Sequence, residues 1–369
     1  MMKTKLRLRD LGIVIGELNP GRLNAISDVP GVLVGMTTII SDSPSTRRTG
    51  VTAILPRPDI HQDAVFAGCH SFNGIGEMTG GAFIEETGRL TSPIVLTCTH
   101  QLGLAYEAVV RYGASKFGGF TFTLPVIGET YDGWLNEAGE FPLQEEHVTA
   151  ALESAGEGPI AEGNCGGGTG NISYEFKAGT GTASRTAPVL DQTFTVGALV
   201  QANHGEREHL LVDGVKVGRA VGKEVVPLPW LDEPGSSSIL IILATDAPLL
   251  PQACRRMAQR AVVGLAKTGG YGLNGSGDLI LAFSTGNHLP RSWEGRLEEH
   301  KSVPFYEMDS LLIAAAEVVE EAILNALVAA ETMTGFHGRT AYALPHDLLR
   351  KAMAGNSPGS APDHEANRR

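Results

Sequence analysis

Short apolar runs rich in β-branched residues recur along the chain and predict buried strands. The strongest run is Ser238–Thr245, SILIILAT, which is apolar at nearly every position, as expected for a strand covered on both faces. Further strands are predicted at Val51–Leu55, Ser92–Thr99, Thr121–Ile127, Thr193–Ala202 and Leu279–Ser284. Pro125 places an edge or a bulge in the run that contains it, because proline cannot donate a hydrogen bond to a β-ladder.

Apolar and small residues at helical spacing predict helices at Gln101–Tyr112, Pro251–Lys267 and Ser310–Met333. The last is the longest, with Ser310 as a suitable N-cap and Gly335 as a suitable stop. Its acidic residues cluster on one side, which predicts an amphipathic helix that could serve an interface. Strands that alternate with helices indicate a mixed α/β protein with buried central strands and helices outside.

The 369 residues show no repeat with a period of 20–50 residues, so we expect one domain over residues 1–369. A proline-rich and serine-rich break, Pro227–Ser238, leads into the strongest predicted strand. The end of the chain, Gly355–Arg369, is polar and rich in Gly, Pro, Ser and Ala, which predicts a disordered tail.

Charge and composition exclude several classes of function. The net charge is −12, and no long basic run interleaves with aromatic residues, so we expect no nucleic-acid partner. The longest stretch without a charged residue, Leu90–Tyr106, is shorter than the ~20 apolar residues of a membrane span, so we expect no membrane insertion. The start of the chain lacks the apolar core of a signal peptide, and the four cysteines are far apart, which together favour a reducing cytoplasm.

Glycine is in excess, at 46 of 369 residues, and much of it lies in three loops, Asn73–Gly81, Gly163–Asn171 and Gly269–Asp278. Such loops can cradle phosphate groups, but the chain has no GxxxxGK[ST] string. Tight turns and close backbone packing explain the glycines better, and a nucleotide-binding protein remains the less favoured alternative. The eleven histidines show no zinc-site spacing, so we expect neither a metal nor a cofactor.

Several strings, read together, resemble the L-aminopeptidase/D-esterase family, which includes the β-peptidyl aminopeptidases. They are DVPGVLVGMTTI, RTGVTAILPR, FNGIGEMTG, GETYDGWLNEAG, GGGTGN followed by FKAGTGTASR, VGALVQANHG, SSSILIILATDAPLLPQACRRMAQRA and TGGYGLNGSGDLILAFST. They occur in the family's order from about Ile26 to the long predicted helix near Thr334. Each string alone would be a weak signal.

The resemblance implies a four-layer α-β-β-α sandwich, like that of N-terminal nucleophile hydrolases but with different connectivity. It also implies self-cleavage between Ser237 and Ser238, into residues 1–237 and 238–369. Ser236, two residues earlier and after Gly235, is a rival cut site. We prefer Ser238 because it adjoins the strand directly, and a two-residue shift would move the hydroxyl roughly 6.6 Å along the chain.

The resemblance assigns roles to six side chains. Ser238 would be the nucleophile, and its freed α-amine, which titrates near neutral pH, would be the candidate base. Ser276 would hydrogen-bond near this nucleophile and Asp278 would orient the network. Asn203 and Tyr131 would stabilise the oxyanion, and Glu129 would hold the free amino group of the substrate.

The activity that the resemblance implies is that of a self-processing serine aminopeptidase, amidase or esterase, which releases the N-terminal residue of small substrates through an acyl-enzyme. The alternative within the same chemistry is a self-cleaving acyltransferase. Family members assemble from several processed αβ heterodimers, so we expect a homo-oligomer. Whether the substrate begins with an L-α-, a D-α- or a β-amino acid stays open.

Overall fold

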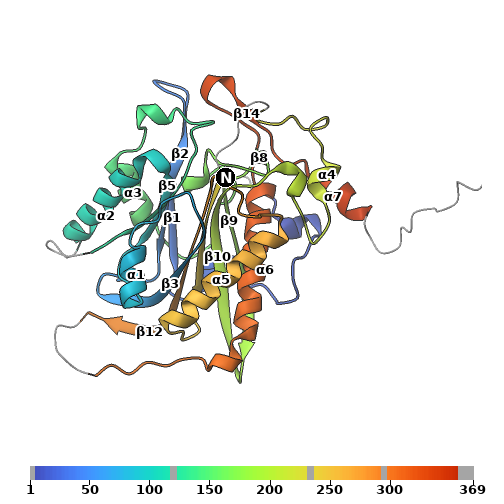
Figure 1. The fold of residues 1–369 in the computed structure, drawn as a ribbon. Coiled ribbons are helices and arrows are strands. Elements are labelled where there is room, and N and C mark those ends of the chain that lie inside the picture. Colours follow the sequence, from blue (N-terminus) through green and yellow to red (C-terminus); the bar gives the residue numbers. More distant parts are fainter. Residues whose placement is uncertain (1–4, 117–122, 231–236, 292–296, 356–369) are drawn as a thin grey trace, which may run out of the picture.

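Two β-sheets that pack face to face form the centre of the molecule, which is described by a computed structural model covering residues 5–116, 123–230, 237–291 and 297–355 (Figure 1). The smaller sheet has the order β1-β2-β5-β6, and its strands are Leu33–Ser41, Arg47–Leu55, Ile94–Cys98 and Val126–Thr130. The larger sheet has the order β4-β3-β12-β11-β10-β9, and its strands are Arg89–Leu90, Asp63–Gly74, Ser276–Pro290, Ser237–Thr245, Gln192–Asn203 and Thr180–Val189. Two short hairpins complete the strands, β7 (Ile172–Ser173) with β8 (Phe176–Lys177) and β13 (Met333–Thr334) with β14 (Thr340–Ala341).

Helices cover the outer face of each sheet. In Figure 1, α2 (Leu102–Lys116) and α3 (Glu145–Glu153) lie on the side of the smaller sheet, and α5 (Pro251–Lys267) and α6 (Asp309–Val328) lie on the side of the larger one. Three shorter helices are α1 (Gly81–Thr87), α4 (Val217–Ala220) and α7 (His346–Ala354). The layers therefore run helix, sheet, sheet, helix, and the expected four-layer α-β-β-α sandwich is confirmed.

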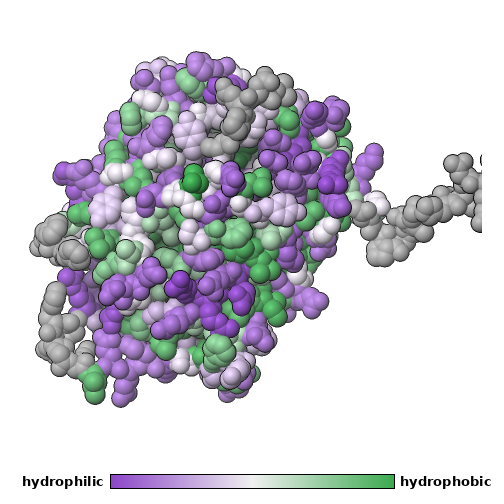
Figure 2. All heavy atoms as spheres, in the orientation of Figure 1, coloured by the Kyte–Doolittle hydropathy of each residue, from purple (hydrophilic) through white to green (hydrophobic). Residues whose placement is uncertain are grey.

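Three hydrophobic cores fill the spaces between these four layers of helices and sheets. The central strands are therefore covered on both faces. In β11, Ile239 and Ile241 pack into the core beneath α5 and α6, whereas Leu240 and Ile242 pack into the core between the two sheets. A third core lies between the smaller sheet and α2 and α3. The surface in Figure 2, by contrast, mixes hydrophilic and hydrophobic residues.

Most of the predicted elements are present, with shifted ends. Of the predicted strand Thr121–Ile127, the structure describes the part from Thr123 onward, where β6 begins after Pro125 because proline cannot join the ladder. The predicted helix Ser310–Met333 begins at Asp309 and ends at Val328. Ser310 is not its N-cap, because it lies within the first turn and Met308 occupies the cap position, and Met333 belongs to the hairpin strand β13. Ser236 and the expected tail from residue 356 onward lie outside the described residues.

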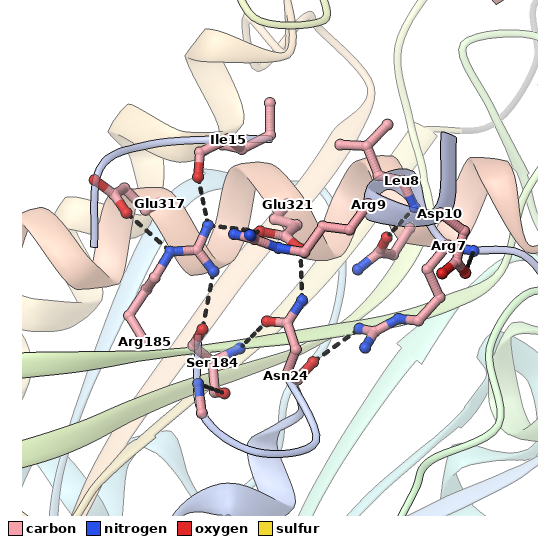
Figure 3. A network of polar contacts seen from close by, with 12 residues as sticks. Arg7, Leu8, Arg9, Asp10, Ile15, Asn24, Ser184, Arg185, Glu317 and Glu321 are labelled. Atoms are coloured by element: carbon pink, nitrogen blue, oxygen red, sulfur yellow. Dashed lines mark hydrogen bonds and ion pairs between the residues drawn. The ribbon is translucent and has the colours of Figure 1, made fainter. Parts of the chain in front are cut away.

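The amphipathic interpretation of α6 is wrong, because its three glutamates, Glu317, Glu320 and Glu321, are buried. Glu317 and Glu321 bind the fully buried Arg185 of β9, at 2.9 and 2.6 Å (Figure 3). Arg9 donates two further hydrogen bonds to Glu321, at 2.8 and 3.0 Å. The acids therefore fasten the helix to the large sheet and to the N-terminal segment, and this side of the helix is not available as an interface.

Candidate functional site

The first residues of β11 bring the predicted site residues to one end of the large sheet. In the strand register, Ser238 lies opposite Asn203 of β10 on one side and Gly277 of β12 on the other. Ser238 is buried, with 6% of its surface exposed. The predicted nucleophile, the predicted oxyanion amide and the Ser276–Asp278 motif thus meet on three adjacent strands.

Strand alternation sends consecutive hydroxyls to opposite faces of this sheet. Ser238 has the parity of Leu240, which faces the other sheet, and Ser237 has the parity of Ile239, which faces the helices. Accordingly the Ser237 hydroxyl, and not that of Ser238, lies 3.0 Å from the Ser276 hydroxyl. The Ser238 hydroxyl donates to the Ser237 carbonyl oxygen at 2.6 Å.

On the helix side, a chain of hydrogen bonds leads to a buried carboxyl group. The Ser276 hydroxyl donates to Oδ1 of Asp278 at 2.7 Å, and both residues are 1% exposed. The other oxygen of Asp278, Oδ2, has no hydrogen-bond partner among the described residues. Burial raises the pKa of Asp278, and the hydrogen bond from Ser276 offsets this only in part.

On the inter-sheet side, Asn203 is held at both ends of its carboxamide. Its Oδ1 accepts from the backbone N–H of Ile172 at 2.9 Å, and its Nδ2 donates to the Tyr131 carbonyl at 3.0 Å. The carboxamide retains a second N–H that could serve an oxyanion. Tyr131 itself is 37% exposed, and its ring meets the His100 ring edge-on at 5.5 Å between centroids.

Glu129 lies in β6 of the smaller sheet, and its side chain lies near the end of the larger sheet where β11 begins. Its carboxylate accepts from the Glu77 backbone N–H at 2.9 Å and from the Thr99 hydroxyl. Gly76 fits tightly beside it, because a Cβ there would lie 3.3 Å from Glu129 Oε1 and 3.2 Å from the Cα of Gly277. Gly277 is the register partner of Ser238, so Glu129 lies close to the start of β11 although 109 residues separate it from Ser238 in sequence.

A hollow of about 810 Å³ lies on the helix side of this strand end. Ser237, Ser276 and Asp278 line it, together with residues that the sequence did not single out, among them His204, Arg207 and Tyr271. The position of His204, directly after Asn203, was the one available signal for these residues. Burial lowers the pKa of His204 to about 3, so its imidazole is neutral at physiological pH.

The glycine-rich loops serve close packing and turns, as the preferred interpretation predicted. In the loop Gly163–Asn171, the N–H groups of Gly166 and Gly167 donate to Thr38 and Thr52 side chains, so they are not free to hold a phosphate. In the loop before β12, Gly269, Gly272 and Gly275 have φ values of +90°, +63° and +89°, which glycine adopts without strain. These turns deliver Ser276 to the start of β11.

Among the described residues, one group has the composition of a metal site, Glu206, Glu208 and His209, whose ligand atoms lie within 4.8 Å of one another. The group is largely exposed, and exposed acidic groups are common without an ion. In the described part of the chain, no helix combines the length and apolarity that crossing a bilayer requires.

Comparisons with known proteins agree with the resemblance drawn from the sequence. The family model described as peptidase family S58 matches residues 24–341. The chain is 42% identical to the β-peptidyl aminopeptidase of Sphingosinicella microcystinivorans over 364 residues, which covers 94% of this chain and 91% of that protein. A β-aminopeptidase structure from Burkholderia sp. superposes with a TM-score of 0.88 at 45% identity, covering 97% of this chain and all of that one. The L-aminopeptidase D-Ala-esterase/amidase of Ochrobactrum anthropi, described as a variant of the Ntn hydrolase fold, superposes with a TM-score of 0.87 at 41% identity, over 94% of this chain and 98% of that one.

Proposed function

Because the chain belongs to peptidase family S58 and is a serine hydrolase of the aminopeptidase, amidase and esterase class, we propose that it activates itself by cutting its own chain before Ser238. The observation that carries this proposal is the contact between the Ser238 hydroxyl and the Ser237 carbonyl, 2.6 Å between oxygens. The carbonyl carbon that this hydroxyl would attack is bonded to that oxygen. The precursor therefore holds the proposed nucleophile against the bond that it would attack.

The proposed cleavage has two steps, transfer of the acyl group to the Ser238 hydroxyl and hydrolysis of the ester that forms. The Ser238 oxygen forms a bond to the Ser237 carbonyl carbon, the C–N bond between the two residues breaks, and the hydroxyl proton passes to the Ser238 nitrogen. Water then hydrolyses the resulting ester, which leaves a carboxylate on Ser237 and a free amine and hydroxyl on Ser238. This step creates the base as well, because the amide nitrogen before cleavage cannot accept a proton and the α-amine after it can.

In the processed enzyme, the neighbouring groups would act on the nucleophile and on different parts of the substrate. Departure of Ser237 would release the Ser276 hydroxyl, still held by Asp278, toward the new amino terminus. Asn203 Nδ2 and the Tyr131 hydroxyl would donate to the oxyanion, which is charged only near the transition state. The Glu129 carboxylate, buried beside Gly277, would bind the ammonium group of the substrate.

We infer that the substrates are small peptides, amides or esters with a free amino group, in line with the named activities of the relatives. We also infer a homo-oligomer of processed αβ heterodimers. A cytoplasmic location fits the four cysteines, which are all unpaired. Burial raises the pKa of Cys69, Cys98 and Cys165 to about 12, so these thiols are unreactive at neutral pH.

The test is the intact mass of the purified protein beside two single variants. We expect the wild type to give fragments of residues 1–237 and 238–369, and Ser238→Ala to remain one chain of 38.9 kDa without activity. Ser236→Ala is the matched control and should be cut and active as the wild type is. Cleavage before residue 236, or full activity in Ser238→Ala, would refute the assignment.

A further inference from the structure

Lys177 is a fully buried lysine that the proposed chemistry does not use. It lies in β8, directly opposite Ile172 of β7. Its Nζ donates to the backbone carbonyls of Asn171, at 2.7 Å, and of Ala178, at 2.5 Å. Burying an ammonium group is costly unless its hydrogen bonds are satisfied, so this lysine holds its position through those two carbonyls.

The Asn171 carbonyl belongs to the same peptide group as the Ile172 N–H. This N–H is the donor that holds Oδ1 of Asn203, at 2.9 Å. A continuous chain of hydrogen bonds therefore runs from Lys177 Nζ, through the 171–172 peptide, to the Asn203 carboxamide. Hydrogen bonds in such a chain polarise one another, so the Lys177 amino group at one end strengthens the donor at the other.

The side chain of Asn171 holds the same peptide from a second direction. Its carboxamide hydrogen-bonds the Thr130 hydroxyl, at 2.9 and 3.2 Å, and Gln201 Nε2 also donates to that hydroxyl, at 2.7 Å. Thr130 precedes Tyr131, whose carbonyl accepts from Asn203. The peptide that orients Asn203 is thus fixed through its carbonyl by Lys177 and through the Asn171 side chain by β6.

We propose that Lys177 is a positioning residue for the reaction, and that it orients and polarises the Asn203 carboxamide through the peptide group between Asn171 and Ile172. The proposal rests on the proposed role of Asn203 in binding the oxyanion. Because Lys177 would act through the amide that binds the oxyanion, its contribution belongs to the transition state and not to binding of the substrate in its ground state. Burial lowers the pKa of Lys177 to about 7, and the charged and titratable groups that also influence it are Cys165, Lys5 and Asp132.

The experiment measures kcat and KM of Lys177→Met and Lys177→Gln, with rates normalised to the amount of processed chain determined by mass. We expect kcat to fall about 10- to 100-fold, as for a misplaced transition-state contact, with KM changed less than about twofold. An aminoalkyl boronic acid, which mimics the tetrahedral intermediate, should lose affinity in the same proportion as kcat. Arg9→Met is the control for removing a partly buried cation that pairs with a buried carboxylate of α6, and should lose stability while keeping kcat.

Asn203→Ala separates this proposal from the proposed function. If Asn203→Ala lowers kcat and both Lys177 variants keep it, the positioning role is refuted and the oxyanion role stands. If Asn203→Ala keeps kcat, the oxyanion role itself is wrong. The double variant Lys177→Met with Asn203→Ala should be no slower than Asn203→Ala alone, whereas additive losses would contradict the relay.

Discussion

Asp278 combines a buried carboxyl group with one oxygen that has no partner among the described residues. Because burial raises its pKa, the ionised form is costly in the folded protein. Its contribution to stability is therefore greatest when it is protonated, below its ordinary value of 3.8, and is lost as the pH rises through the raised pKa. A carboxyl group kept in such a place is expected to serve catalysis and not folding.

We therefore predict that Asp278→Asn raises the melting temperature at neutral pH and lowers kcat about 100-fold, because the amide still accepts from Ser276 but carries no charge. Thermal unfolding and kcat, both measured against pH, test this. Asp246→Asn is the matched control, since burial also raises the pKa of Asp246 but it lies at the opposite end of β11. A stabilised Asp278→Asn with undiminished kcat would remove Asp278 from the mechanism.

At the residue scale, the predicted site residues lie on neighbouring strands, but the sequence did not indicate on which face of the sheet each hydroxyl lies. The apolar run after Ser238 predicted a buried strand that starts there, and the resemblance supplied the partners on the neighbouring strands. Which hydroxyl meets Ser276 depends on strand parity and register, and these are set by pairing with β10 and β12. The burial and contacts of Lys177 could not be predicted from the sequence, because its partners are backbone carbonyls, which every residue has.

At the scale of elements, α6 shows how a charge pattern can mislead. Its acids looked like a solvated face because their partners, Arg185 and Arg9, come from distant parts of the chain. Burial alone would raise the pKa of Glu321, but hydrogen bonds and charge from Arg9, Arg185 and Asn24 hold it below its ordinary value. This ionised glutamate thus adds stability above its ordinary pKa of 4.5, and the stability is lost as the pH falls through the depressed value.

We predict that Arg185→Met lowers the free energy of unfolding by about 3–5 kcal/mol, because it leaves two buried carboxylates with fewer partners. Denaturant unfolding measures the change. Adding Glu317→Gln to that variant should recover part of the loss, since one uncompensated charge is removed. Arg111→Met, which breaks an exposed pair with Glu107, should leave stability nearly unchanged, and an equal loss there would contradict the role of burial.

At the scale of the molecule, the four layers place the two halves of the site on different sheets. Glu129 and Tyr131 come from the end of β6, whereas Asn203, Ser238 and Ser276 come from β10, β11 and β12. The alternation of strands and helices predicted a mixed α/β protein, but the packing of one sheet on the other came from the resemblance. The local sequence pattern does not determine which strands become neighbours. The glycines let segments that are distant in sequence pack closely, and these contacts are seen only in the folded structure.

Mass analysis of the protein trapped during turnover of a slow ester substrate with a free amino group tests directly whether Ser238, freed by cleavage, is the nucleophile. We predict that the acyl group is found on the fragment of residues 238–369, and that peptide mapping places it on its first residue, Ser238. An active protein that stays a single chain of 38.9 kDa, or an acyl group on any other residue, would contradict activation by cleavage and the assignment of Ser238 as the nucleophile.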